Sequence, residues 1–63
     1  MYIVSVISLE CGSYVLKYRS AIEAEDMALE ISEEPEVDEV QLSERKGNIT
    51  NLVAVYEDGV QVM

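Results

Sequence analysis

The sequence predicts a single α+β domain with the order ββαββ, in which one amphipathic helix packs on an antiparallel sheet of four or five strands. Three observations predict this class. Two extended segments open the chain, a helical segment follows them, and two more extended segments come after it, with turn residues between the elements. A chain of 63 residues has room for one hydrophobic core, so residues 1–63 are expected to form one domain.

The first nineteen residues predict a β-hairpin. Residues 2–9 are rich in Ile and Val, and residues 14–19 alternate between apolar and polar side chains. Between them, Cys11 and Gly12 form a turn in which Gly12 is free to take a positive φ.

Ser20 is the expected N-cap of the helix, and Glu23 three positions later completes a capping box. Good helix formers continue to about Glu34, and Pro35 ends the helix. The spacing places six residues on one broad apolar face: Ala21, Ala24, Met27, Ala28, Leu29 and Ile31. The expected core contains Ala24, Ala28, Ile31, Leu16 and Leu42.

The second half of the chain predicts further strands. Residues 37–44 are extended, residues 46–48 (Lys-Gly-Asn) form a turn, and residues 49–57 form the longest strand. Asp58-Gly59 is a strong hairpin turn, so residues 60–63 are expected to fold back as a short fifth strand.

Several strands carry apolar residues on both faces, although one helix covers only one face. Ile3 and Ile7 oppose the Val4 face, and strict alternation puts Leu52 with Ala54 and Tyr56, opposite Ile49, Val53 and Val55. The uncovered residues predict a homodimer, formed through the sheet face or edge to edge. The alternative is a set of scattered exposed valines, which is ordinary on protein surfaces.

The residues of catalysis and metal binding are missing from the sequence. There is no histidine to act as a general base or to activate Cys11, and no serine lies in a nucleophile-elbow context. Zinc ligands are absent, and Glu36-Val37-Asp38-Glu39 lacks the spacing of a calcium loop. We therefore expect no enzyme activity, no catalytic residues, no metal and no cofactor.

Charge and cysteine content narrow the location and the partners. One cysteine permits no intrachain disulfide, which fits a reducing cytoplasm. The apolar opening run is too short to span a bilayer. Thirteen acids against four bases give a net charge of −9, so anionic membranes and nucleic acid should both be repelled.

The acids are concentrated between Arg19 and Arg45, where ten acids stand without one base. This arrangement costs helix stability, because Asp26–Glu30 and Glu30–Glu34 are like-charge pairs one turn apart. Such a surface either serves solubility alone or matches a basic groove on a partner, in which case its closely spaced carboxylates imitate the phosphates of a duplex. The candidate partner-binding residues are Glu23, Asp26, Glu30, Glu33, Glu34, Glu36, Asp38 and Glu39.

Two stretches carry a resemblance to phage proteins. The opening hairpin, the acidic alanine-rich helix start (residues 20–25) and the returning strand (residues 37–42) resemble small phage-encoded inhibitors of bacterial RNA polymerase. Residues 52–59 (LVAVYEDG) are similar to the closing hairpin of small ββαββ anti-CRISPR proteins. The resemblance rests on pattern, implies an inhibitor, and carries over no functional residue.

The sequence thus predicts a small acidic binding protein that acts on a host protein with a basic surface. The expected source is a phage or mobile element, and the expected target handles nucleic acid or serves in host defence. The alternative is a homo-oligomeric accessory domain whose acidic face serves only solubility.

Overall fold

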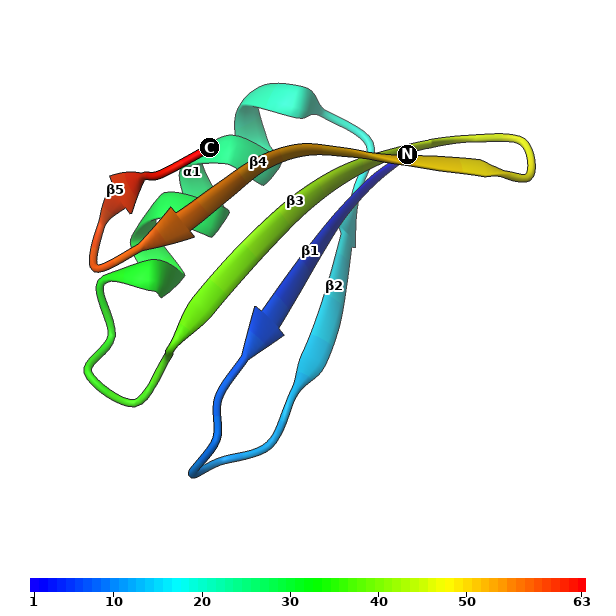
Figure 1. The fold of residues 1–63 in the computed structure, drawn as a ribbon. Coiled ribbons are helices and arrows are strands. Elements are labelled where there is room, and N and C mark those ends of the chain that lie inside the picture. Colours follow the sequence, from blue (N-terminus) through cyan, green and yellow to red (C-terminus); the bar gives the residue numbers. More distant parts are fainter.

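The computed structural model describes residues Met1–Met63, and it has one helix packed on one face of a five-stranded antiparallel sheet (Figure 1). The strand order is β2-β1-β3-β4-β5, so the first strand lies inside the sheet. This confirms the predicted α+β class and the fifth strand. The elements are β1 (Tyr2–Ile7), β2 (Tyr14–Tyr18), α1 (Ala21–Ser32), β3 (Glu39–Lys46), β4 (Ile49–Glu57) and β5 (Val60–Gln61).

The helix starts as predicted and ends two residues earlier than predicted. The Ser20 side chain accepts from the Glu23 amide at 3.4 Å, which is one half of the expected capping box. At the other end, the Glu34 amide donates to the Ile31 carbonyl three residues back, at 3.1 Å. This tighter turn closes the helix before Pro35, which disfavours helical geometry in the residue ahead of it.

The third strand begins later than predicted, at Glu39 rather than at Val37. The Val37 amide closes a turn by donating to the Glu34 carbonyl at 3.1 Å, and its side chain is buried in the core. The strand then runs on to Lys46, because its pairing with β4 continues to the hairpin turn, where Lys46 lies opposite Ile49.

The core lies between α1 and the central strands. Ala24, Ala28 and Ile31 of the helix are buried against four sheet residues, Val4, Val6, Val40 and Leu42. Leu16 is half-buried at its border. The small side chains of Ala24 and Ala28 let the helix lie close to the sheet. Leu29 was placed wrongly on the apolar face, since it lies at its margin and is 39% exposed.

A β-bulge in β4 changes which face its residues occupy. Leu42 pairs with Ala54 but the next residue, Ser43, pairs with Leu52, so Val53 has no opposite residue. Neighbouring residues of β3 point to opposite faces, and therefore Leu52 and Ala54 do too. The prediction that they share a face was wrong, because it assumed strict alternation. Ala54 is buried under the helix, whereas Leu52 is exposed.

The β4–β5 turn anchors the end of the sheet to the helix. Asp58 and Gly59 both have positive φ, as the Asp-Gly turn predicted. The Gly59 amide donates to the Ser32 hydroxyl at 3.1 Å, and that hydroxyl donates to the Leu29 carbonyl at 2.7 Å. Ser32 is buried and thus links the end of α1 to this turn.

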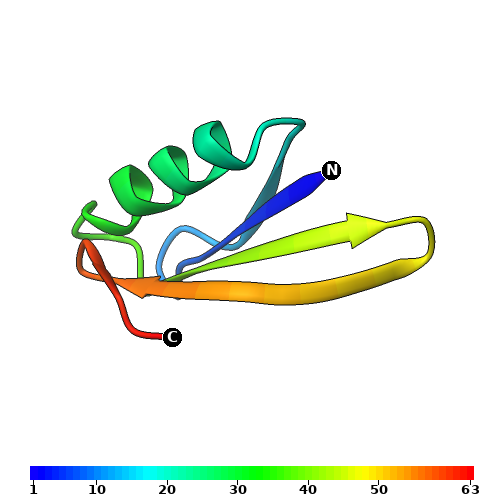
Figure 2. The ribbon, with the colours of Figure 1, turned by 90° about the horizontal axis from the view of Figure 1, so that it is seen from above.

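No helix covers the other face of the sheet, and only the C-terminal end of the chain turns toward it (Figure 2). We call it the open face; its charged residues are Lys17, Glu39 and Arg45, and the others are uncharged. The helix itself has neither the length nor the apolar composition needed to cross a membrane. The open face carries Ile3, Ser5, Ile7, Val15, Lys17, Glu39, Gln41, Ser43, Arg45, Leu52 and Val55.

A candidate acidic interface

Three candidate residues form a stripe along the outer surface of α1. Glu23, Asp26 and Glu30 are all exposed, and they follow one another at intervals of three and four residues. That spacing stacks them along one side of the helix, about 5–6 Å apart. We call these three residues the helix stripe.

The start of the helix stripe borders a shallow groove between α1 and β2. The groove has a volume of about 320 Å³ and is lined by Tyr18, Glu23, Asp26 and Met27. Two carboxylates beside an aromatic ring and a thioether suit a lysine or arginine side chain. Its aliphatic stem would pack on Met27, and its charge would meet the carboxylates and the ring of Tyr18. The groove thus has the chemistry of an acceptor for a basic side chain.

Three more candidates extend the acidic surface beyond the helix. Glu33, Glu34 and Glu36 are exposed around the C-terminal end of α1. The last helical turn carries no basic residue, so these carboxylates face the negative end of the helix dipole without compensation. They adjoin the helix stripe along the chain, because Glu30 lies in the last turn of α1 and Glu33 follows its end.

Asp38 and Glu39 lie apart from the acids on α1 and around its end. The Asp38 carboxylate accepts a hydrogen bond of 2.7 Å from the Leu9 amide, and the Asp38 amide donates to the Ile7 carbonyl at 2.9 Å. Asp38 thus holds the loop after β1. Glu39 pairs with Ile7 on the open face, where its carboxylate accepts from the Gln41 side chain at 2.7 Å. Both carboxylates have structural partners within the chain.

Most carboxylates have no basic partner in the chain. The single ion pair joins Lys46 to Glu44 at 3.8 Å, which leaves 12 of the 13 acids without one. The acids do not gather into a cluster of three that could hold a metal ion. The acidic surface is consequently available to cations from outside the molecule.

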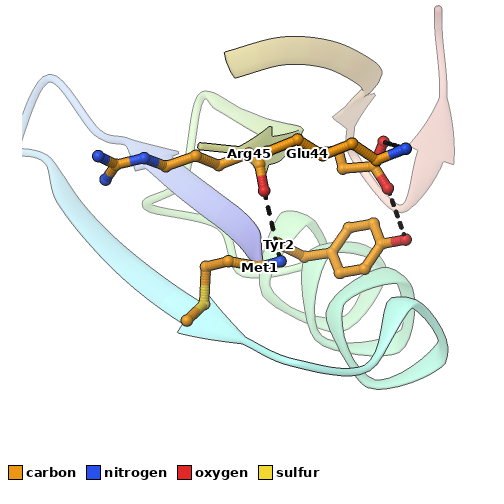
Figure 3. Close-up of polar contacts among 5 residues, drawn as sticks. Met1, Tyr2, Glu44 and Arg45 are labelled. Carbon is orange, nitrogen blue, oxygen red and sulfur yellow. Dashed lines mark hydrogen bonds and ion pairs between the residues drawn. The ribbon is translucent and has the colours of Figure 1, made fainter. Parts of the chain in front are cut away.

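All four bases lie toward one end of the sheet, where β1 starts and β3 ends. Lys17 and Arg45 line a second shallow groove of about 250 Å³ together with Met1, Ile3 and Gly47. The Met1 nitrogen donates to the Arg45 carbonyl at 3.5 Å, beside the hydrogen bond of Tyr2 to Glu44 (Figure 3). We call Lys17, Arg19, Arg45 and Lys46 the basic end.

Two tyrosines near Glu25 have raised pKa values. The Tyr2 hydroxyl donates to the Glu44 carboxylate at 3.0 Å, and this bond, with the charges of Glu44 and Glu25, raises the pKa of Tyr2 above its ordinary value. Burial, followed by the charge of Glu25, raises the pKa of Tyr56. Both effects favour the neutral phenol over a second negative charge.

Sequence reasoning missed three residues of this surface. Tyr18 was assigned only to the second strand and Met27 only to the apolar face of the helix. Glu25, whose charge acts on both Tyr2 and Tyr56, was left out of the candidate set. The acidic run contained Glu25, but its position beside the sheet depends on how α1 packs. Known proteins add no further guide, since no family model, no curated protein and no solved structure matches the chain.

Proposed function

We propose that the chain is a small non-enzymatic binding protein whose acidic surface occupies a basic groove on a partner protein. The observation that carries this proposal is the set of exposed carboxylates without basic partners, gathered along α1 and around its end. Exposed carboxylates that repel one another oppose folding, so their concentration on one surface is better explained by binding than by stability.

The spacing of the helix stripe supports a groove that normally holds nucleic acid. Carboxylates about 5–6 Å apart along a helix form a row of regularly spaced negative charges. Basic side chains that contact the phosphates of nucleic acid could contact such a row in the same way. The acceptor groove at Tyr18 and Met27 would take one such side chain. We therefore propose an inhibitor, from a phage or mobile element, of a host protein that handles nucleic acid or serves in defence. It would act in the cytoplasm.

The test is affinity capture from a bacterial lysate, with the immobilised chain and with duplex DNA as competitor. A stripe variant (Glu23→Gln, Asp26→Asn, Glu30→Gln) should lose the captured proteins, and both DNA and added salt should release them from the unchanged chain. Thermal unfolding of the variant checks that it remains folded.

A control variant removes the same charge elsewhere, through Glu10→Gln, Glu57→Gln and Asp58→Asn. All three positions are exposed and lie outside the candidate set. The control should capture as the unchanged chain does. An equal loss of captured proteins in both variants would show that only net charge matters. Capture that survives both the stripe substitutions and competing DNA would refute the proposal.

The second candidate is a homo-oligomeric accessory domain, and the open face favours it. Ile3 and Ile7 lie on a sheet face that no helix covers. In that case the acids maintain solubility, and the stripe variant would assemble as the unchanged chain does.

A further inference from the structure

One edge of the sheet ends in a strand that has neighbours along only part of its length. β4 pairs with β3 from Ile49 to Tyr56 except at the bulged Val53, but β5 pairs only with Tyr56 and Glu57. The residues after β5 extend this cover by one position, because Val62 and Met63 exchange backbone hydrogen bonds with Val55. On the side away from β3, no strand lies beside residues 49–54, and we call this segment the free edge.

The direction of the backbone groups on the free edge follows from their partners in β3. The Arg45 amide donates to the Met1 carbonyl at 2.8 Å, so Arg45 faces β1 and turns away from β4. Its opposite residue, Thr50, must then turn away from β3. The same alternation applies to Ser43 and its opposite residue Leu52. The N–H and C=O groups of Thr50 and Leu52 therefore point outward from the sheet.

The free edge lacks charge and proline, two of the usual protections of an edge strand, and its one irregularity is the bulge at Val53. Residues 49–56 contain no charged residue and no proline, and Ile49, Leu52 and Val53 are 64%, 46% and 48% exposed. The opposite edge, β2, is shorter and carries Lys17, with Arg19 just beyond it. An uncharged edge with free backbone groups is a template for another strand.

A second copy of the chain fits this edge in one antiparallel register. With a two-fold axis at Asn51, Thr50 of each copy lies opposite Leu52 of the other. The outward backbone groups of Thr50 and Leu52 are then paired, and Ile49 comes opposite the bulged residue Val53. Other registers leave part of these groups without partners.

The charge distribution favours the same arrangement. Arg45 and Lys46 lie where β4 begins, and Glu57 and Asp58 lie where it ends. Antiparallel pairing brings the basic hairpin of one copy toward the acidic turn of the other. A pairing through the helices would instead bring their acidic surfaces together.

We propose that two copies of the chain pair through their free edges, joining the two five-stranded sheets into one continuous sheet with both helices on the same face. This dimer does not depend on the proposed acidic interface, because the helix stripe lies on α1, away from the free edge.

The test compares proline substitutions at the two edges by sedimentation equilibrium. Thr50→Pro removes an outward amide and leaves the β3–β4 ladder intact. Val15→Pro is the matched control at the β2 edge. The even-numbered residues of β1 bond to β2, so Leu16, which pairs with Val4, faces β1. The amide of the neighbouring Val15 therefore points outward from the sheet. Circular dichroism checks the folding of both variants.

The unchanged chain and Val15→Pro should sediment at twice the monomer mass of 7.1 kDa at high concentration, and Thr50→Pro should remain monomeric. Leu52→Lys keeps the backbone intact and places a charge on each side of the junction, so it should weaken dimerisation at least tenfold. A monomer at millimolar concentration would overturn the proposal. A dimer that survives both Thr50→Pro and Leu52→Lys would also overturn it and would indicate pairing through the open face. A dimer that only Val15→Pro abolishes would indicate pairing through the β2 edge instead.

Discussion

Replacing Glu30, Glu33 and Glu34 by glutamine should make the protein more stable. The substitutions keep side-chain size and helix propensity almost unchanged, so they remove charge and little else. Glu30 lies one turn from Asp26, whereas Glu34 follows the end of α1 at Ser32 and so does not form the predicted helical pair with Glu30. All three replaced residues lie in or just after the last turn of α1, which carries no base.

The expected gain is on the order of 1 kcal/mol. The like-charge pair Asp26–Glu30 costs roughly 0.2–0.5 kcal/mol. Each carboxylate near the negative end of the helix dipole costs about 0.3 kcal/mol, the low end of the range, because the side chains are exposed and solvent screens them. For a domain of this size, 1 kcal/mol corresponds to a rise in Tm of roughly 4–8 °C.

Thermal unfolding followed by circular dichroism, at low and high salt, measures this gain. It should shrink as salt screens the repulsion in the unchanged protein. The variant Glu10→Gln, Glu57→Gln, Asp58→Asn carries the same net charge and should gain less, because these residues lie off the helix. A loss of stability in the helix variant, or an equal gain in the control, would refute the reasoning.

Three further predictions concern the core and its polar links. Leu42→Ala should cost about 2–5 kcal/mol, because Leu42 is 1% exposed at the centre of the core, and urea unfolding should show the loss. Ser32→Ala should cost about 1–3 kcal/mol, measured in the same way, since it leaves the Gly59 amide without its partner. The raised pKa values of Tyr2 and Tyr56 add stability that is fully present below the ordinary tyrosine pKa of 10.0 and is lost as pH rises through the folded values. Tyr2→Phe should reduce this alkaline loss, with unfolding measured on both sides of that pH.

The fold was largely predictable because the local patterns agree with one another. The Ser20 cap, the Pro35 stop and the Asp58-Gly59 turn each mark a boundary through the chemistry of one or two residues. The bulge at Val53 was not predictable in this way. No glycine or proline marks it, and it arises from the pairing of β4 with β3.

The acidic surface was predictable only in part. Periodicity alone placed Glu23, Asp26 and Glu30 together, since they lie on one helix. Asp38 and Glu39 are acidic residues like the other candidates, so the sequence does not distinguish them. Their positions depend on contacts with Leu9 and Gln41, however, and sequence spacing does not encode those contacts.

The central place of β1 has a consequence for the order of events in folding. β1 meets β2 through a short loop, but it meets β3 through residues as far apart as Tyr2 and Glu44, 42 positions along the chain. The two hairpins can therefore form early and separately. The sheet closes only when the chain between them, including α1, brings β1 against β3, and closing so long a loop is slow. Barrier crossing should thus coincide with the docking of two preformed halves. Because unfolding reverses this step, the amides shared by β1 and β3 should lose protection from exchange no later than those within each hairpin.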